Sequence, residues 1–199
     1  MSGVRLVLAS ASPRRRQLLS QLGVSYACDP ADIDETPIAG EPPGEYVRRI
    51  ARCKAATVAA RYQAPEYRVL AADTTVVIGD DVLGKPRDRA HGLAILARLS
   101  GRTHTVLTAV CLHGSAGIGC ELVETKVEFV QLSLQACEAY LATPEPWDKA
   151  GAYAIQGLGG AFVRSINGSY SNVVGLPLYE TWQLLASNDI TTALEPAGE

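Results

Sequence analysis

The stretch Leu8-Ala9-Ser10-Ala11-Ser12-Pro13-Arg14-Arg15-Arg16 joins a predicted strand to a predicted helix near the start of the chain. The apolar run over residues 4–9 is typical of a strand. Ser12 can cap the helix, and Pro13 can begin it because the first helical residue needs no N–H partner. A leucine stripe follows, and Gly23 is typical of a helix end. The sequence therefore predicts a strand, a tight turn and a helix up to Gly23.

Three arginines, Arg14, Arg15 and Arg16, lie in the first turn of this predicted helix, where cations are normally unfavourable. Free backbone N–H groups, the positive end of the helix dipole, the hydroxyls of Ser10 and Ser12 and the guanidinium groups would all favour an anion there. An anionic partner would explain the arginines. A solvated arginine run on an ordinary helix is the alternative, and this stretch alone leaves it open.

Length and composition are those of a globular protein. The 199 residues, 47% hydrophobic and 20% charged, suffice for one domain or for two small lobes. We expect a single domain over residues 1–190 and a flexible tail over 191–199. No apolar run is long enough to cross a membrane, and the start of the chain lacks the apolar core of a signal peptide. The expected location is the cytoplasm, with no membrane partner.

Charge and cysteine content argue against several other classes of protein. The net charge of −3 argues against a general nucleic-acid-binding protein, so any recognition of phosphate must be local. The five cysteines are odd in number, widely spaced and without a Cys-x-x-Cys pair, which argues against a disulfide framework and a zinc knuckle. None of the three histidines lies at a metal-ligand spacing from a cysteine.

A second predicted helix, over about residues 43–62, carries an inward-facing lysine. Lys54 falls on the same helical stripe as the apolar Val47. A buried lysine needs a carboxylate or an anion as its partner, although its ammonium group could also extend to solvent. The polar loop over residues 29–44, before this helix, holds several carboxylates, among them Glu35.

Asp73 interrupts an apolar run over residues 67–78 that is typical of a buried strand. Its carboxylate is best explained at a strand end or a bulge that faces a cleft, because a buried charge needs a partner. A turn at Gly79 and a short return strand follow, and the return strand stops before Lys85. Hairpin geometry would bring Lys85 back toward Asp73 and Thr74. A capping or hairpin-closing aspartate is the alternative.

The order of the remaining elements predicts an α/β fold with a mixed sheet and flanking helices. The glycine-rich loop after Gln156 matches neither a P-loop nor a strand-linked dinucleotide-binding motif. The further expected elements are a helix from Asp88, two β-rich runs over residues 103–112 and 120–132 joined by a turn over 114–119, a helix from Ser133, a strand over 161–166 and a last helix from Pro177.

Motifs spread over almost the whole chain resemble, in order, those of the Maf family of nucleoside triphosphate pyrophosphatases. They are Ser10-Ala-Ser-Pro-Arg-Arg, Asp34-Glu35, Arg52-Cys-Lys54-Ala, Ala72-Asp73-Thr74, Gly84-Lys85-Pro86-Arg87-Asp88, Ser100-Gly101-x-Thr103-His104, Asp148-Lys149-Ala-Gly-Ala-Tyr153-x-Ile-Gln156-Gly and Ile166-Asn-Gly-Ser-Tyr170 with Val174-Gly-Leu-Pro177. The resemblance implies hydrolysis of a nucleoside triphosphate to its monophosphate and pyrophosphate. It also implies a fold like that of the ITP pyrophosphatases, with an elongated sheet and two lobes around a cleft, a divalent metal (Mg²⁺ or Mn²⁺) and a homodimer.

The residues that are unusual on physical grounds are those that this chemistry needs, because cleaving a phosphoanhydride requires charge neutralisation and an activated water. By resemblance, Asp73 is the general base, and Lys54 and Lys85 are catalytic. Ser10, Arg14 and Arg15 are suited, with these lysines, to binding the triphosphate. Glu35 and Asp73 are suited to holding the metal, since Mg²⁺ and Mn²⁺ prefer oxygen ligands.

Arg14, Thr74 and Gln156 occupy the positions that distinguish subgroups of the family, and this combination resembles the subgroup that acts on dTTP and UTP. Gln156 can offer both a donor and an acceptor to a uracil or thymine edge, whereas a cationic 7-methylguanine would favour carboxylates. We expect dTTP and UTP as substrates, with CTP and modified pyrimidine nucleotides as an extension. A 7-methyl-GTP pyrophosphatase and a non-catalytic, nucleotide-binding inhibitor of septum formation are the alternatives.

Overall fold

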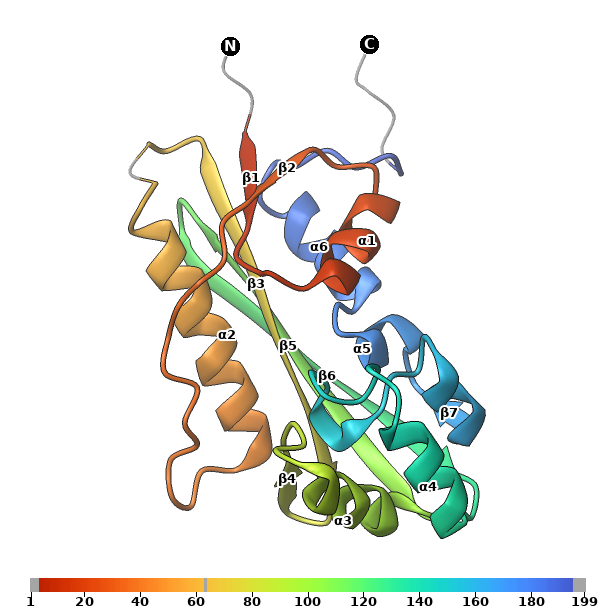
Figure 1. Cartoon of the computed structure of the whole chain (residues 1–199). Helices are drawn as coiled ribbons and strands as arrows, with labels where there is room; N and C mark the ends of the chain where they lie inside the picture. The colour runs from red at the N-terminus through yellow and green to blue at the C-terminus, as the bar shows by residue number, and fades with distance from the viewer. Residues whose placement is uncertain (1–3, 63, 195–199) are drawn as a thin grey trace. The chain divides into compact units, whose positions relative to one another are not determined.

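The computed structural model describes residues 4–62 and 64–194 (Figure 1). Its contacts divide the chain into two compact units. The first unit consists of the described parts of Met1–Asp73, Thr108–Val123 and Gly175–Glu199. The second unit consists of Thr74–Leu107 and Glu124–Val174. No helix of the described chain is both long enough and apolar enough to cross a membrane.

The strands form a mixed sheet, as the order of elements predicted. Their order is β2-β1-β3-β5-β6-β7, and β4 pairs with β3. The strands are β1 (Arg5–Leu8), β2 (Tyr26–Cys28), β3 (Tyr67–Ile78), β4 (Asp81–Leu83), β5 (Thr103–Gly114), β6 (Gly117–Phe129) and β7 (Val163–Asn167). The pairs of β1 with β2 and β3 are parallel, whereas β3–β4 and β6–β7 are antiparallel. The α/β class with a mixed sheet is confirmed.

In the first unit, β1 leads into α1 (Pro13–Gln21) through the predicted serine cap. The Oγ of Ser12 accepts a hydrogen bond from the backbone N–H of Arg15 at 3.4 Å. Leu18 and Leu19 are buried on the inner face of the helix. Gly23 has a φ of +69°, the left-handed conformation that ends helices and that residues with a side chain avoid. The strand, cap, helix and glycine stop are therefore confirmed.

The other helices of the first unit are α2 (Pro43–Ala59) and α6 (Leu178–Ala186). The helix predicted to reach residue 62 ends at Ala59, because the next N–H groups, of Arg61 and Tyr62, bond to carbonyls only three residues back. The core of this unit combines the buried face of α2 with the buried residues of β1 and of the first half of β3. Its fully buried residues include Leu8, Leu19, Val47, Ile50, Val58, Leu70, Leu112 and Leu185.

The end of the described chain packs onto α1, which differs from the flexible tail expected over residues 191–199. Thr192 is only 3% exposed, and the N–H of Ala193 donates to the carbonyl of Leu22 at 2.8 Å. A Cβ on Gly23 would lie 2.5 Å from that of Ala193, so the two segments touch. Residues 191–194 are therefore packed, and the rest of the expected tail, 195–199, lies outside the described residues.

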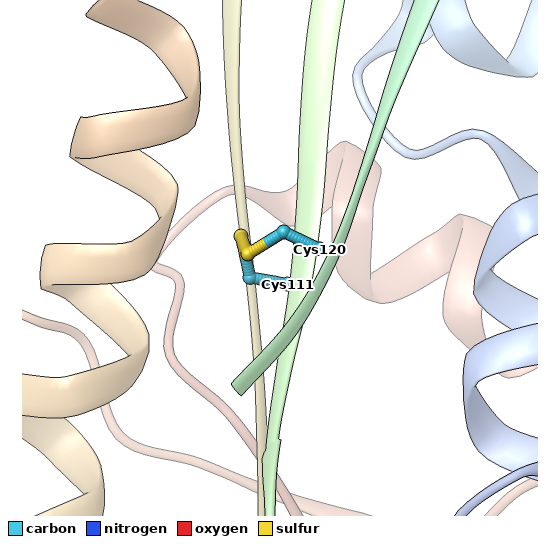
Figure 2. The surroundings of a disulfide bond; sticks show 2 residues. All are labelled: Cys111 and Cys120. Atoms are coloured by element: carbon cyan, nitrogen blue, oxygen red, sulfur yellow. A yellow bond between two sulfur atoms is a disulfide. The ribbon is translucent and has the colours of Figure 1, made fainter. Parts of the chain in front are cut away.

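A disulfide joins Cys111 and Cys120 on neighbouring strands of the first unit, which corrects the expectation from cysteine spacing (Figure 2). β5 and β6 are joined by a two-residue turn at Ser115 and Ala116, shorter than the predicted segment. Cys111 and Cys120 are equally far from this turn, so they lie directly opposite each other with Cα atoms 4.1 Å apart. A wide spacing in sequence did not prevent the pairing, because a hairpin turn brings distant positions together.

The second unit contains the hairpin of β3 with β4, in which Val76 lies opposite Leu83. The chain after Leu83 therefore runs back along β3, as the predicted hairpin required. The helices of this unit are α3 (Arg89–Leu99), α4 (Leu134–Leu141), α5 (Tyr170–Val174) and the short 3₁₀ helices η1 (Ala150–Ala152) and η2 (Leu158–Phe162). Asp88 caps α3 and Ser133 caps α4, both as predicted.

An aromatic cluster fills the core of the second unit. Phe129 contacts His104, Tyr153 and Phe162 edge to face, with ring centroids 4.7–6.0 Å apart. Such aromatic pairs add about 0.5–1.5 kcal/mol beyond the burial of their area. The leucine and isoleucine side chains of α3 and the hydrophobic face of α4 complete this core.

Candidate active site

The ammonium group of Lys54 lies between two carboxylates of the first unit. Its Nζ is 2.8 Å from Oδ1 of Asp73 and 2.7 Å from Oε1 of Glu35. Lys54 is only 9% exposed and Asp73 only 7%, whereas the side chain of Glu35 is about half exposed. The inward-facing lysine predicted from the helical stripe is confirmed, and its partners are carboxylates rather than solvent.

The local sequence explains why this ion pair is buried. Lys54 lies on the buried stripe of α2 that also carries Val47 and Ile50. Asp73 follows a wholly buried stretch of β3, residues 68–72, and continues that burial. Two charged side chains in such apolar surroundings are tolerated only as a hydrogen-bonded pair. Glu35 reaches the pair from the loop before α2, and this loop was predicted to carry carboxylates.

Burial raises the pKa of Asp73 above its ordinary value, because the apolar surroundings disfavour the charged carboxylate. The positive charges of Lys54 and Arg15 oppose this shift, and the negative charge of Glu35 adds to it. The net result is a carboxylate that holds a proton more readily than a free aspartate does. That property suits a group that must accept a proton from water.

Two residues at the start of α1 have partners within the first unit. The Nε of Arg15 donates to the carbonyl of Gly175 at 2.8 Å, and the Oγ of Ser10 accepts from the N–H of Ser12 at 3.2 Å. Enclosure of the guanidinium lowers the pKa of Arg15, and the charge of Asp73 opposes that shift. Arg15 is therefore held close enough to Asp73 and Glu35 to interact with both carboxylates. Arg14 is half-buried beside it.

The remaining predicted site residues belong to the second unit. Thr74 is half-buried on β3, Lys85 is exposed after β4, and Gln156 is exposed in the glycine-rich loop. The structure brings Glu35, Lys54, Asp73 and Arg15 together. That the three residues of the second unit act with this group stays a prediction.

Tyr46, which was not among the predicted site residues, joins the first-unit group. Its hydroxyl donates to the backbone carbonyl of Glu35 at 3.0 Å. Burial, together with the charges of Asp73 and Glu35, raises the pKa of Tyr46 to about 12. A signal was present, because Tyr46, Ile50 and Lys54 follow one another at the four-residue spacing of a single helix face.

His104, by contrast, is buried in the core of the second unit. Its Nε2 lies 2.9 Å from the Tyr153 hydroxyl, and burial lowers its pKa to about 4. Burial among aromatic rings thus favours the neutral form of this imidazole.

Glu35 and Asp73 are the side chains here whose oxygens could hold a divalent metal. Carboxylate oxygens are the ligands that Mg²⁺ prefers, and Mg²⁺ sites often use one or two carboxylates with substrate phosphates. Over residues 4–62 and 64–194, no cluster of three or more His, Cys, Asp or Glu side chains has a geometry that could hold a metal. The donor set fits a metal that is completed by phosphate oxygens and water.

Fold and site thus define a mixed α/β protein with a buried, lysine-paired aspartate close to an arginine-bearing helix start. The sequence profile of the Maf-like proteins matches residues 5–188, and the chain belongs to this family. It is 56% identical over 185 residues to a dTTP/UTP pyrophosphatase of Anaeromyxobacter dehalogenans, a match covering 91% of this chain and 92% of the relative.

Two further relatives carry the same name. A dTTP/UTP pyrophosphatase of Myxococcus xanthus is 56% identical over 180 residues, covering 90% of each chain. That of Shewanella oneidensis is 50% identical over 193 residues, covering 94% of this chain and 100% of the relative. The resemblance seen in the motifs is therefore confirmed at the level of the family.

Proposed function

We propose that this protein is a nucleoside triphosphate pyrophosphatase that hydrolyses dTTP and UTP to the monophosphate and pyrophosphate. The observation that carries the proposal is the buried carboxylate of Asp73, with its raised pKa and its ion pair with Lys54. Similarity to relatives named dTTP/UTP pyrophosphatase supports the substrate class. CTP and modified pyrimidine triphosphates extend the expected range of substrates.

In the proposed reaction, Asp73 takes a proton from a water molecule whose oxygen bonds to the attacked phosphorus. The bond from that phosphorus to the oxygen bridging the α and β phosphates breaks, and pyrophosphate leaves with the bonding electrons. Lys54, whose Nζ is 2.8 Å from Oδ1 of Asp73, favours the ionised form of that carboxylate and compensates the charge of Glu35. Asp73 returns its proton to solvent when the products leave.

Arginine and lysine side chains bind the triphosphate in this proposal, because a phosphate chain needs several positive charges to enter a partly buried site. These side chains are Arg14, Arg15, Lys54 and Lys85, and the hydroxyl of Ser10 binds the triphosphate with them. Gln156 and Thr74 contact the base, and Arg14 contributes to the choice of substrate. The carboxamide of Gln156 offers the donor and the acceptor that the uracil and thymine edges require.

We further propose that Glu35 and Asp73 hold Mg²⁺ or Mn²⁺. A bound divalent ion would shield the negative charges of the phosphates. The support is the meeting of two carboxylates at one cation, the ammonium of Lys54, in the structure. Removal of metal with EDTA should abolish turnover, and addition of Mg²⁺ or Mn²⁺ should restore it.

Product analysis tests the proposed function directly. Purified protein with Mg²⁺ or Mn²⁺ is given dTTP, UTP, CTP, GTP, 7-methyl-GTP and ITP, and an Asp73→Asn variant is assayed beside it. Monophosphate and pyrophosphate from dTTP and UTP, lost in the variant, would support the proposal. Cleavage of 7-methyl-GTP alone would overturn the choice of base. Tight nucleotide binding without any product would indicate a non-catalytic regulator.

The expected setting is a cytoplasmic homodimer, and both parts are proposals. Nucleoside triphosphates are intracellular metabolites, and the resemblance to the family supports the dimer. Cell fractionation tests the compartment, and light scattering of the purified protein at several concentrations tests the assembly. A monomeric mass at all concentrations would contradict the dimer.

A further inference from the structure

The loop that carries Gln156 is fixed by the carboxylate of Glu145. Oε2 of Glu145 accepts a hydrogen bond from the N–H of Leu158 at 2.9 Å, and Oε1 accepts from the N–H of Gly159 at 3.0 Å. The hydroxyl of Tyr140 donates to the same Oε1 at 2.8 Å. All of these groups belong to the second unit, so the contacts hold within it.

Tyr140 extends this fixation to the other side of Gln156. Its hydroxyl accepts a hydrogen bond from the N–H of Ala154 at 3.0 Å while it donates to Glu145. Ala154 lies two residues before Gln156, and Leu158 lies two residues after it. The pair of Tyr140 and Glu145, here called the loop anchor, therefore holds the backbone on both sides of Gln156, whose side chain is exposed.

Gly157 shows how closely the loop anchor approaches this backbone. A Cβ at Gly157 would lie 2.2 Å from Oε2 of Glu145, a distance that no real side chain accommodates. Its φ of −160° is extended backbone that any residue can adopt, so the glycine is required by the close approach and not by its backbone angle. The carboxylate and the glycine next to Gln156 fit each other.

The charge of Glu145 suits this role. Its burial alone would raise the pKa, but the N–H groups of Gly159 and Leu158 and the hydroxyl of Tyr140 together lower it below the ordinary value. Burial and the charge of Glu145 raise the pKa of Tyr140, so the phenol keeps its proton. Donor and acceptor roles are thereby assigned, and the anchor is fully formed at neutral pH.

We propose that Glu145 and Tyr140 are positioning residues that set the discrimination between pyrimidine bases by holding Gln156 in place. The proposal rests on the proposed function, in which Gln156 contacts the base. Uracil and thymine present a donor at N3 beside an acceptor at O4, whereas cytosine presents an acceptor at N3 beside a donor at N4. A carboxamide on a fixed backbone can be aligned with one pattern, whereas a carboxamide on a loosened loop reaches both less selectively.

The test is a double-mutant cycle on the ratio of kcat/KM for UTP to that for CTP. Glu145→Gln keeps the shape of the side chain but turns an NH₂ group toward an N–H of the loop, so the anchor loses an acceptor. We expect the ratio to fall about tenfold, the size of one aligned hydrogen bond, mainly through a higher KM for UTP. Tyr140→Phe removes only the hydroxyl, and a smaller fall in the same direction is expected.

Gln156→Ala separates this proposal from the one on which it rests. If the anchor acts through Gln156, Glu145→Gln should leave the ratio unchanged in a Gln156→Ala background. A merely structural role of Glu145 would lower the activity in both backgrounds. Glu138→Gln is the matched control, because this glutamate also lies on α4 but forms an exposed ion pair with Arg89.

The outcomes separate the role of the anchor from that of Gln156. If Gln156→Ala changes the ratio but Glu145→Gln and Tyr140→Phe leave it unchanged, the anchor is overturned and the role of Gln156 is kept. A ratio that Gln156→Ala leaves unchanged would overturn both. If Glu145→Gln does not fold, as judged by circular dichroism, the cycle is carried out with Tyr140→Phe. Without turnover, the same ratios are measured as Kd values for UTP and CTP.

Discussion

Asp73 is buried and Glu145 half-buried, but the surroundings of these two carboxylates move their pKa values in opposite directions. Within residues 4–62 and 64–194, Asp73 accepts a side-chain hydrogen bond from the charged Lys54 alone, and burial raises its pKa. Glu145 accepts from two backbone N–H groups and a phenol, and these donors lower its pKa despite the cost of burial. The difference comes from the number of donors around each group.

This difference separates a group suited to proton transfer from one suited to holding structure. A carboxylate surrounded by donors is stable as an anion and has little affinity for a further proton. A carboxylate with few donors, in apolar surroundings, keeps its affinity for a proton and can act as a base. The number of donors thus predicts that Asp73 acts in the reaction and that Glu145 acts on the loop.

The largest expected effect comes from Asp73→Asn, which removes the proposed base and keeps its shape. We expect kcat for dTTP to fall about a thousandfold, within the range that general-base catalysis supplies. Glu145→Gln should leave kcat within about tenfold of the wild type, because its effect is on alignment. Steady-state kinetics of both variants measure the contrast. Similar losses of kcat in the two would break the distinction between these carboxylates.

Lys54→Met should have the next largest effect, because it removes the charged partner of Asp73. Activity requires Asp73 to be deprotonated, so the acidic limb of the pH profile of kcat/KM follows its pKa. Loss of the positive charge raises that pKa, and the limb should move upward by about one pH unit or more. Lys126→Met, on an exposed position of β6, is the control. An unmoved limb would contradict the assigned base.

Gly157→Ala should disrupt the loop anchor through a change on the loop itself, with Glu145 and Tyr140 left in place. The new Cβ would meet Oε2 of Glu145 at 2.2 Å, and relieving this overlap should cost about 1–3 kcal/mol of unfolding free energy. Gly84→Ala is the control, since a Cβ there meets nothing within 4 Å. Urea denaturation measures both. In a Glu145→Ala background the overlap is absent, so Gly157→Ala should lower the unfolding free energy less than it does in the wild type. An equal loss in both backgrounds would show that the carboxylate is not the cause.

The smallest expected effect is on how stability depends on pH. The lowered pKa of Glu145 means that its contribution is present above the ordinary glutamate pKa of 4.5 and is lost as the pH falls through the folded value. Glu145→Gln should therefore make Tm fall less steeply below pH 4.5. Asp73, with its raised pKa, contributes with the opposite sign, because its contribution is lost as the pH rises from 3.8 through the folded value. Asp73→Asn should change the slope in the opposite sense.

Local signals explain why much of the fold could be predicted from the sequence. The Ser12 cap and the Gly23 stop act within a few residues, so α1 was placed correctly. Lys54 and Asp73 were found because each is a charge in an apolar pattern, and such a charge must have a partner. Glu35, the second carboxylate that pairs with Lys54, was suggested by its place in an acidic loop and by the resemblance to the family.

The missed features depend on contacts between distant parts of the chain. The Cys111–Cys120 bond required the register of a hairpin whose turn was predicted too long. Glu145 lies between two prolines, and nothing in the nearby sequence indicates that its carboxylate oxygens accept hydrogen bonds from a loop beyond η1. Hydrogen-bond partners of this kind follow from tertiary packing, which a periodicity or a cap does not encode.

The disulfide between Cys111 and Cys120 also restricts the register in which β5 can pair with β6 in the folded chain. In the second unit, Nδ2 of Asn172 donates both to the carbonyl of Val106 and to Oγ1 of Thr125. Val106 lies as far before Cys111 along β5 as Thr125 lies after Cys120 along β6, so one alignment of the strands satisfies both contacts. A slip by one residue would separate the sulfur atoms, deprive the asparagine of a partner and turn every inward side chain outward. Two independent interactions therefore stabilise this register of the hairpin, one a disulfide bond and the other the hydrogen bonds of Asn172.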